Sequence, residues 1–388
     1  MNNMVRGRGD MRRFAAAAAG ACAANATWWM QPILIGYLIT NASLSAPLAG
    51  LLVSAEMAAL AATSALIVRF APHWEFRKTG LLGMGLAIIA SIATLGLHQF
   101  VPLLIARCLA GAGVGAALVV SNRVVAGFDD PDKAFARINV VNLIFGALIV
   151  GLAPLLHGVS VTDPYAAILL ALLALSVAMA LLPKLRPPAA NPEQAVGAPV
   201  GPLVVGPALV ALMAITLIVG ISSGTLWAFY GIIGGQAGLS VAQVDGAISL
   251  AIVAAIAGSA IGGLIGVRFG RLAPVLAALA IMTIGISMLA SHPSAAGFRV
   301  ATCANLAALY FVLPYVFGAA AALDTSGRGV SYVGGIFYFT GAVSPVLGGY
   351  LERVAGIEVV GAAVFVGSAI ASLLFVYVQR LAKTAVAG

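Results

Sequence analysis

Long apolar segments, each followed by a short polar break, repeat along the whole chain. Twelve of these segments are long enough to form helices, and they fall into two sets of six. The first set covers residues 14–39, 46–70, 78–97, 100–126, 135–157 and 163–183, and the second covers residues 204–233, 241–267, 272–290, 295–322, 327–351 and 357–380. A helix that crosses the hydrocarbon core of a bilayer needs about 20 apolar residues. The pattern therefore predicts an all-α membrane protein with twelve transmembrane helices.

A segment of different composition separates the two sets. Residues 184–203 (KLRPPAANPEQAVGAPVGPL) are rich in proline, alanine and glycine and contain few large apolar side chains. Such a composition is typical of a linker. We therefore expect an N-terminal six-helix bundle over residues 1–183, a cytoplasmic linker over residues 184–203 and a C-terminal six-helix bundle over residues 204–388.

The two halves resemble each other in sequence. LIVRF at residues 66–70 has a counterpart in LIGVRF at residues 264–269. Arg137 and Arg328 each open an apolar segment, and each is followed seventeen residues later by a proline. Two parallel six-helix repeats are typical of transporters that hold their cargo between the halves, near the middle of the membrane. The expected fold is thus a pair of pseudo-symmetric six-helix bundles.

Composition supports the membrane assignment. Of the 388 residues, 62% are hydrophobic and only 8% are charged, whereas a soluble domain carries about 25% charged residues. So few charged side chains cannot cover a soluble protein of this length, which excludes a soluble enzyme, a nucleic-acid-binding protein and a disordered scaffold. The formal net charge of +8 does not indicate nucleic acid, because the basic residues are scattered along the chain.

The basic residues are distributed unevenly between the two sides of the membrane. If twelve helices cross it and both termini are cytoplasmic, seventeen of the twenty Lys and Arg residues lie in cytoplasmic segments. Arg299 and Arg353 lie on the outer side, and Arg107 lies within a helix. An excess of positive charge marks the cytoplasmic loops of membrane proteins. We therefore expect a multi-pass protein of the cell (inner) membrane with both termini in the cytoplasm.

A glycine-rich loop in the second half resembles a signature of the major facilitator superfamily. Residues 263–271 (GLIGVRFGR) are similar to the pattern Gly-x-Leu-x-Asp-Arg-x-Gly-Arg, which lies between the second and third helices of a half in that family. Arg268, Gly270 and Arg271 occupy matching positions, while Val267 stands where the family has Asp. The similarity extends over essentially the whole chain, because the helix number, the central linker and the repeat also fit.

The first half carries a less complete copy of this loop. In residues 64–72 (SALIVRFAP), Arg69 matches the arginine of the family, and a valine again replaces the Asp. The resemblance implies that Arg69, Arg268, Gly270 and Arg271 belong to gating loops that hold the cytoplasmic side closed through charge pairs. In both halves the Asp of the family's pattern is missing.

A second motif lies in the fourth predicted helix. Arg107 is followed by Gly111, Gly113 and Gly115, which resembles the arginine and spaced glycines of the fourth helix in the same family. There, the arginine at this position is linked to proton coupling. The glycine- and proline-rich segment 146–158 is similar to the fifth helix of the family's antiporters, which favours export.

Two charged residues lie inside predicted spans. Glu56 is the only acidic residue near the middle of one, and Arg107 is the only basic residue well inside one. A charge at a helix centre costs about 2.5–3.5 kcal/mol on insertion scales and so suggests a function. A partly dehydrated carboxyl holds a proton more readily than one in water. A guanidinium cannot lose its proton and needs a partner, which could be Glu56, backbone carbonyls or an anionic substrate.

We therefore assign proton coupling to Glu56 and Arg107. The alternative for Glu56 is a structural carboxyl that is hydrogen-bonded to a neighbouring helix. The alternative for Arg107 is a structural contact between helices. The sequence does not show whether the two side chains touch.

Polar and aromatic residues mark the walls of an expected central cavity. The resemblance implies that the first, fourth, seventh and tenth helices line this cavity, and the fifth and eleventh helices add further candidates. The candidate substrate-binding residues are Asn25, Trp28, Gln31, Arg107, Asn142, Trp227, Tyr230, Asn305, Tyr310 and Tyr338. An apolar pocket with a few polar groups suits an amphipathic organic molecule. For each residue, helix packing or anchoring at the membrane surface is the alternative.

Several kinds of site have no sequence support. The chain contains neither the HExxH nor the paired-cysteine spacing of zinc sites, and it contains no GxxxxGK[ST] phosphate loop. We therefore expect no metal, no cofactor and no ATP-driven pumping. The expected partners are a small organic substrate, protons and the lipid bilayer, with the chain acting as a monomer that binds no nucleic acid.

These observations favour a secondary active transporter that moves a small organic solute by alternating access, with export in exchange for protons as the first choice. Uptake or uniport of an organic anion bound by Arg107 is the second possibility. A polytopic membrane enzyme is a distant third, because such enzymes usually carry a sizeable loop domain, and we expect no enzymatic activity.

Overall fold

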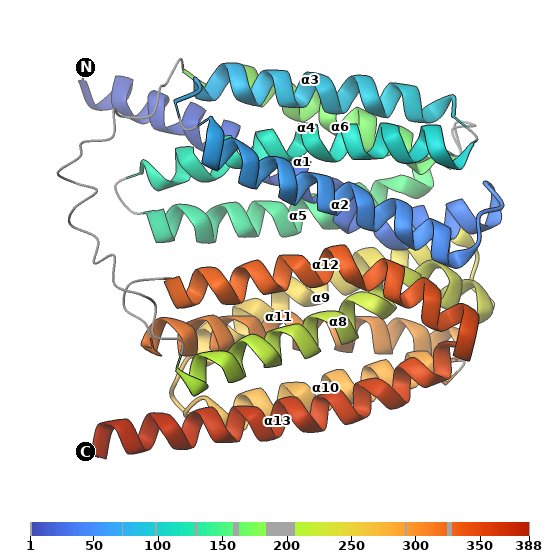
Figure 1. The fold of residues 1–388 in the computed structure, drawn as a ribbon, viewed down its shortest axis with the longest axis vertical. Coiled ribbons are helices and arrows are strands. Elements are labelled where there is room, and N and C mark those ends of the chain that lie inside the picture. The colour runs from blue at the N-terminus through green and yellow to red at the C-terminus, as the bar shows by residue number, and fades with distance from the viewer. Residues whose placement is uncertain are drawn as a thin grey trace. The chain divides into compact units, whose positions relative to one another are not determined.

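The computed structural model describes residues 2–71, 73–97, 99–128, 131–157, 163–183, 206–291, 293–323 and 328–387. The helices are α1 (Asn2–Thr40), α2 (Ala46–Phe70), α3 (Phe76–Leu95), α4 (Phe100–Ala126), α5 (Pro131–His157), α6 (Pro164–Ala180), α8 (Pro207–Gln236), α9 (Val241–Ile265), α10 (Leu272–Ala290), α11 (Ala295–Leu323), α12 (Arg328–Ala355) and α13 (Ile357–Ala387) (Figure 1). Within the described ranges there is no strand. This order confirms the all-α fold class with twelve helices; the predicted linker 184–203 lies outside the described residues.

Most of the helices are suited to a membrane. Among the described residues, eight are long and apolar enough to cross one, namely α2, α3, α4, α8, α9, α10, α11 and α13. Shorter apolar stretches lie in α5 and α6, at Arg137–Leu152 and Pro164–Ala180. Large apolar side chains such as Leu82, Leu264 and Leu373 are more than 60% exposed. So much exposed apolar surface is expected of helices that face lipid.

The chain divides into two compact units. The first unit consists of Met1–Met30 and Ala55–Pro202, and the second consists of Gln31–Ser54 and Leu203–Gly388. The second unit therefore includes the last turns of α1 and the first turns of α2 in addition to α8–α13. Sequence analysis placed the whole of these two helices in the N-terminal bundle.

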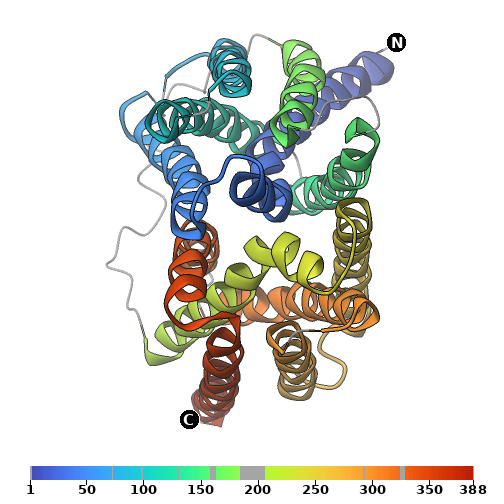
Figure 2. The same cartoon turned by 90° about the vertical axis from the view of Figure 1, so that its right-hand side faces the viewer.

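Small residues bring the helices of the first unit together. In this unit α3 lies beside α4 and α6, as both views show (Figures 1 and 2). A Cβ atom added at Gly113 of α4 would lie 2.5 Å from the carbonyl oxygen of Gly83 in α3, and Gly115 is equally close to the carbonyl oxygen of Leu60 in α2. The backbones therefore touch directly, which is how small residues pack membrane helices.

The second unit is organised around α8 and α11. Helix α8 packs against α12 and α13, and helix α11 packs against α9 and α10. A Cβ atom at Gly258 of α9 would overlap the carbonyl oxygen of Ala307 in α11, and a Cβ at Gly220 of α8 would overlap the side chain of Thr340 in α12. Gly258 and Gly220 thus allow the close packing of these helices.

The start of α2 contacts α12 within the second unit. Pro345 lies inside α12, and because proline has no backbone N–H it interrupts the hydrogen-bond ladder of the helix. A Cβ atom at Gly50 of α2 would overlap the carbonyl oxygen of Pro345. One turn later, the hydroxyl of Ser54 accepts a hydrogen bond from the backbone N–H of Val346 at 3.2 Å. The hydroxyl of Ser54 in α2 thus provides a hydrogen-bond acceptor beside the interrupted ladder of α12.

Candidate functional site

Glu56 of α2 and Arg107 of α4 form a buried ion pair in the first unit. Arg107 Nε donates a hydrogen bond to Glu56 Oε2 at 3.0 Å, and Arg107 Nη2 donates a second one to Glu56 Oε1. Each residue is only 1% exposed. A guanidinium and a carboxylate that meet through two bonds form one of the strongest hydrogen-bonded arrangements in proteins. The structure thus joins the two charged residues that the sequence places inside separate helices.

Residues from three further helices complete the surroundings of the pair. Thr27 Oγ1 of α1 donates to Glu56 Oε1 at 2.8 Å and lies 3.5 Å from the donor Arg107 Nη2. Ser91 Oγ of α3 accepts a hydrogen bond from Arg107 Nη1 at 3.4 Å. The ring centroid of Tyr165, at the start of α6, lies 4.6 Å from Arg107 Cζ, which is a cation–π contact. Side chains of α1, α2, α3, α4 and α6 therefore converge on one pair of charges.

The local sequence explains how these side chains reach one another. A Cβ atom at Gly111, one turn after Arg107, would overlap the carbonyl oxygen of Glu56, so glycine lets α4 approach α2 at the level of the pair. At the start of α6, Asp163 accepts a hydrogen bond from the backbone N–H of Tyr165 at 2.9 Å, and Pro164 occupies the first turn. Such an N-cap fixes where a helix begins. The cap therefore places the ring of Tyr165 against Arg107.

The two charges depend on each other. The carboxylate of Glu56 accepts bonds from Nε and Nη2 of Arg107 and from the hydroxyl of Thr27. An ionised carboxylate is only an acceptor, which fits this set of donors. Removing one member of a buried pair costs about 3–5 kcal/mol, because the other charge is then left without a partner. The charged, closed pair is thus one well-defined state of this site.

Trp29 of α1, the neighbour of the candidate Trp28, packs against α5, where it contacts the candidate Asn142. Trp29 Nε1 donates to Asn142 Oδ1 at 3.3 Å, and a Cβ atom at Gly146 would lie 2.6 Å from the indole ring. Asn25 donates from its amide to a carbonyl one turn earlier in α1, at 2.8 Å. Of the two adjacent tryptophans, Trp29 is buried and Trp28 is half-buried. The amide groups of Asn25 and Asn142 are therefore engaged within the protein.

A second polar cluster lies in the second unit, between α8 and α11. Asn305 Nδ2 donates to Tyr230 Oη at 2.6 Å and to Ser223 Oγ at 3.3 Å. The rings of Trp227 and Tyr230 meet edge to face with their centroids 5.5 Å apart. All four side chains are buried. The structure thus brings together Trp227, Tyr230 and Asn305, which the sequence analysis named on two different helices.

Two buried amides of the second unit, Gln31 in α1 and Asn305 of this cluster, have unused hydrogen-bonding atoms. Gln31 is completely buried, and neither its amide nitrogen nor its amide oxygen has a partner among the described residues. The same holds for Asn305 Oδ1. The residue after Gln31, Pro32, has its carbonyl oxygen against Gly231, which directly follows Tyr230. Buried polar atoms without partners are rare in native proteins, and a polar ligand can satisfy them.

The remaining candidates of the C-terminal half are less buried than this cluster. Tyr310 of α11 is half-buried, and Tyr338 of α12 is 66% exposed. The ring of Tyr338 contacts that of its neighbour Phe337, with the centroids 6.2 Å apart. The tyrosine of α12 is therefore not enclosed with Tyr230 and Asn305.

The predicted gating loops contain exposed arginines. Arg69 and Arg268 are exposed, and Arg271 is half-buried and donates from Nη2 to the carbonyl oxygen of Gly318 at 3.3 Å. Gly270 has a φ of +68°, a conformation that favours glycine. None of the three arginines forms an ion pair with a described residue. This agrees with the absence of the usual Asp from both copies of the motif.

The comparison with protein families decides the assignment. The sequence model of the Major Facilitator Superfamily matches residues 17–215, which is slightly more than half of the chain. The chain belongs to the major facilitator superfamily. No curated protein matches it by sequence.

Solved structures of transporters share the fold. The nucleoside transporter NupG is 11% identical, with a TM-score of 0.69 over 96% of this chain and 99% of that one. A proton dependent oligopeptide transporter is 14% identical, with a TM-score of 0.72 over 95% and 100%. A bacterial homologue of the human lysosomal transporter Spinster, in an inward-facing and occupied conformation, is 13% identical, with a TM-score of 0.68 over 97% and 97%. The protein is thus a multi-pass membrane protein with the fold of secondary transporters.

Sequence analysis missed three residues of the ion-pair site in this superfamily member. Thr27, Ser91 and Tyr165 are common residue types in membrane helices, and nothing in their spacing marks them as neighbours of Arg107. The Asp-Pro pair before Tyr165 signals a helix start but not what that helix contacts. Among the described residues, no three His, Cys, Asp or Glu side chains are grouped closely enough to hold a metal ion.

Proposed function

We propose that this member of the major facilitator superfamily exports a small organic solute across the cell (inner) membrane in exchange for protons, as a monomer with both termini in the cytoplasm. The observation that carries the proposal is the buried ion pair of Glu56 and Arg107, surrounded by side chains of three further helices. Ionisable residues held inside a membrane protein are costly and mark proton or substrate pathways.

Protonation of Glu56 changes the surroundings of Arg107. The neutral carboxyl no longer attracts the guanidinium as a charge, and one of its oxygens becomes a donor. Arg107 cannot give up its own proton, so it keeps its charge and turns to other acceptors. The hydroxyls of Thr27 and Ser91 and the ring of Tyr165 are already within reach. A proton can thus open the contact between α2 and α4 and favour one transport state over another.

The same geometry argues against direct binding of an organic anion by Arg107. Its Nε and Nη2 donate to Glu56, its Nη1 donates to Ser91, and its face lies on Tyr165. An anionic cargo would have to displace Glu56 from the guanidinium. The displaced carboxylate would then be buried without its partner, at a cost of about 3–5 kcal/mol.

The cluster around Asn305 is the proposed contact site for the cargo. Gln31 and Asn305 contribute buried amide atoms that have no partner among the described residues, and Trp227 and Tyr230 add aromatic surface. These four side chains carry no formal charge. The site therefore suits a neutral solute that has hydrogen-bonding groups on an apolar frame.

A Glu56→Gln variant in proteoliposomes tests the coupling. A counterflow screen of neutral and anionic organic solutes with the wild-type chain first identifies a cargo. The variant is expected to exchange this cargo at a rate close to that of the wild type, but to lose accumulation driven by a pH gradient. The amide cannot carry a proton across, whereas exchange of cargo for cargo needs no proton.

The matched control is Glu75→Gln, which removes an acidic group from the turn before α3. This control is expected to keep both the exchange of cargo and the accumulation driven by a pH gradient. Accumulation by Glu56→Gln that still follows the pH gradient would exclude Glu56 as the proton carrier. A cargo found only among organic anions would contradict the proposed neutral substrate.

A further inference from the structure

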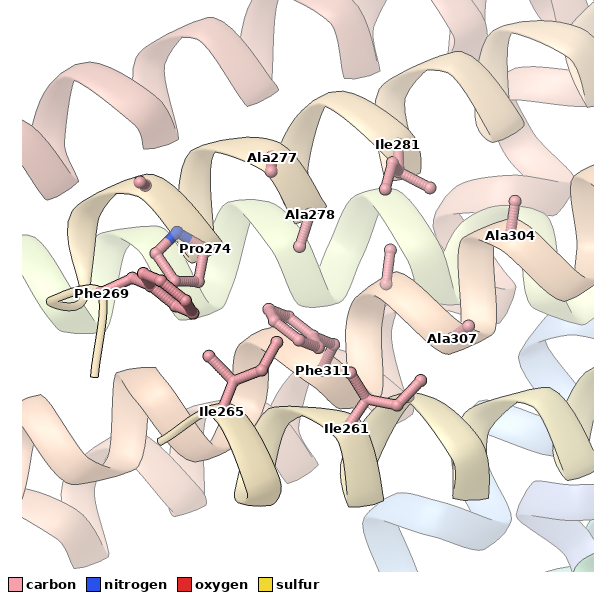
Figure 3. A pocket seen from close by; sticks show the side chains of 13 residues that line it. Ile261, Ile265, Phe269, Pro274, Ala277, Ala278, Ile281, Ala304, Ala307 and Phe311 are labelled. Carbon is pink, nitrogen blue, oxygen red and sulfur yellow. The ribbon is translucent and has the colours of Figure 1, made fainter. Parts of the chain in front are cut away.

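An apolar groove opens on the surface of the second unit. It has a volume of about 500 Å³ and is lined by residues of α9, α10 and α11 and of the turn between α9 and α10. Figure 3 shows Phe269 and Pro274 at one end and Ile281 and Ala304 at the other. Phe269 and Ile281 are 74% and 50% exposed, so the groove is accessible from outside the protein.

Small side chains create the groove. Both α9 and α10 pack on α11, and the groove between them is lined on α11 by the alanines Ala304, Ala307 and Ala308. Along α10 the lining extends from Ala273 to Ile281, which is about 12 Å at 1.5 Å per residue. A narrow apolar trench of this length matches part of a hydrocarbon chain better than it matches a compact solute.

Positive charge lies at one end of the groove. Arg268 directly precedes the lining residue Phe269 and is exposed. Arg271 follows Phe269 by two residues, is half-buried and donates from Nη2 to the carbonyl oxygen of Gly318. From residue 246 to residue 323 the sequence contains no Asp or Glu, so no acidic side chain of α10 or α11 neutralises them. The helix α10 begins at Leu272 without a side-chain cap. Its first turn adds the partial positive charge of a helix N-terminus.

We infer that this groove binds an anionic phospholipid of the surrounding bilayer, with one acyl chain over the alanines of α11 and the phosphate at Arg268 and Arg271. Phe269, at one end of the apolar lining, lies between Arg268 and Arg271 in the sequence, so one molecule can satisfy both. Basic sites next to membrane helices bind anionic lipid headgroups, with about 1 kcal/mol for each arginine near the surface. The bound lipid ties together the turn between α9 and α10 and the surface of α11.

A second groove, in the first unit, provides an internal comparison. It lies between α3 and α4, has a volume of about 370 Å³ and is lined by apolar residues from Leu86 to Leu109. Between residues 79 and 106 the sequence contains no Lys or Arg. Lipid in this groove is therefore expected to show no preference for an anionic headgroup.

Native mass spectrometry of the purified chain tests the inference. The chain is mixed with equal amounts of phosphatidylglycerol and phosphatidylcholine that have the same acyl chains. The wild type is expected to retain phosphatidylglycerol preferentially, and the double variant Arg268→Gln/Arg271→Gln is expected to lose about fivefold of that preference for each arginine. Ala277→Phe, which fills the groove from an exposed position, is expected to reduce retention of the preferred lipid.

Matched variants separate the groove from general effects. Arg299→Gln removes an exposed charge elsewhere on α11, and Ala93→Phe fills the groove between α3 and α4; neither is expected to change the preference for phosphatidylglycerol. Equal retention of the two lipids by the wild type would overturn the inference. So would displacement of the lipid by soluble glycerol phosphate, because phosphate binding alone would then explain the site.

Discussion

Glu56 and Arg107 each bring a charge into the middle of an apolar helix, and each is held there by the other. The bond from Arg107 Nε to Glu56 Oε2 is 3.0 Å long, and both side chains are almost completely buried. A buried charge without its partner strongly destabilises the protein, whereas replacing both charged residues by apolar residues of similar size does not. The pair is therefore sensitive to any change that neutralises only one of its members. Protonation of Glu56 is such a change.

A double-mutant cycle at this pair is expected to be strongly non-additive. Glu56→Leu leaves the guanidinium buried without its carboxylate, and Arg107→Met leaves the carboxylate without its guanidinium. Each single variant is expected to unfold at a clearly lower temperature than the wild type, which reflects a cost of about 3–5 kcal/mol.

The variant with both substitutions is expected to recover most of the lost stability. The measurement is thermal unfolding of the purified chain in detergent. If the double variant were less stable than either single variant, the two residues would be contributing to stability independently.

At this scale the sequence indicates which residues carry charge but not which residues surround them. Glu56 and Arg107 are recognisable because an ionisable group inside a span is rare. Thr27 and Ser91 are not, because hydroxyl side chains are common in membrane helices and often bond to their own backbone, as Thr94 does. Similarly, sequence analysis named Trp28 as a candidate, whereas it is the adjacent Trp29 that is buried and packs against Gly146.

At the scale of single helices, α4 shows how glycine position determines a contact. Gly111, Gly113 and Gly115 face α2 and α3, and each allows a backbone-to-backbone approach. Since Gly111 touches the carbonyl of Glu56, the same close contact that joins α4 to α2 also sets the distance across the ion pair. Packing and the proposed proton coupling therefore share one interface.

The variant Gly111→Ala is expected to impair coupled transport and lower stability. Its methyl group would overlap the carbonyl oxygen of Glu56, which is fixed backbone, so α2 and α4 would have to separate. The control is Gly85→Ala in α3, where a Cβ atom meets nothing within 4 Å.

That control is expected to be neutral or slightly stabilising, because alanine is favoured over glycine in helices by up to about 1 kcal/mol. For both variants, coupled transport is measured in proteoliposomes and stability is measured by thermal unfolding. An unaffected Gly111→Ala variant would show that the contact is not tight in the working protein.

Hydrophobic pattern predicts helix bounds well where polar breaks are sharp. The predicted segments 46–70, 100–126 and 272–290 coincide with α2, α4 and α10. The pattern fails at the start of α1, which begins at Asn2 rather than at residue 14. The first turns are polar, and polar helical residues produce no apolar signal.

At the scale of the whole molecule, the sequence predicts the family and the fold but not how helices group. Helix number, central linker, internal repeat and the two motifs, at residues 263–271 and after Arg107, together led us to expect the major facilitator superfamily, and the family match confirms it. The grouping of residues 31–54 with the C-terminal helices was not foreseen. It depends on contacts such as Gly50 with Pro345, which join segments almost 300 residues apart.

The central claim is that Glu56 takes up a proton when its pair with Arg107 opens. Infrared difference spectroscopy of the reconstituted chain between alkaline and acid pH tests it most directly, with Glu56→Gln as the reference. We predict that acidification produces a carbonyl band of a protonated carboxylic acid in the wild type, and that this band is missing from the variant. Identical difference spectra for the two proteins, at every pH at which both remain folded, would contradict the account.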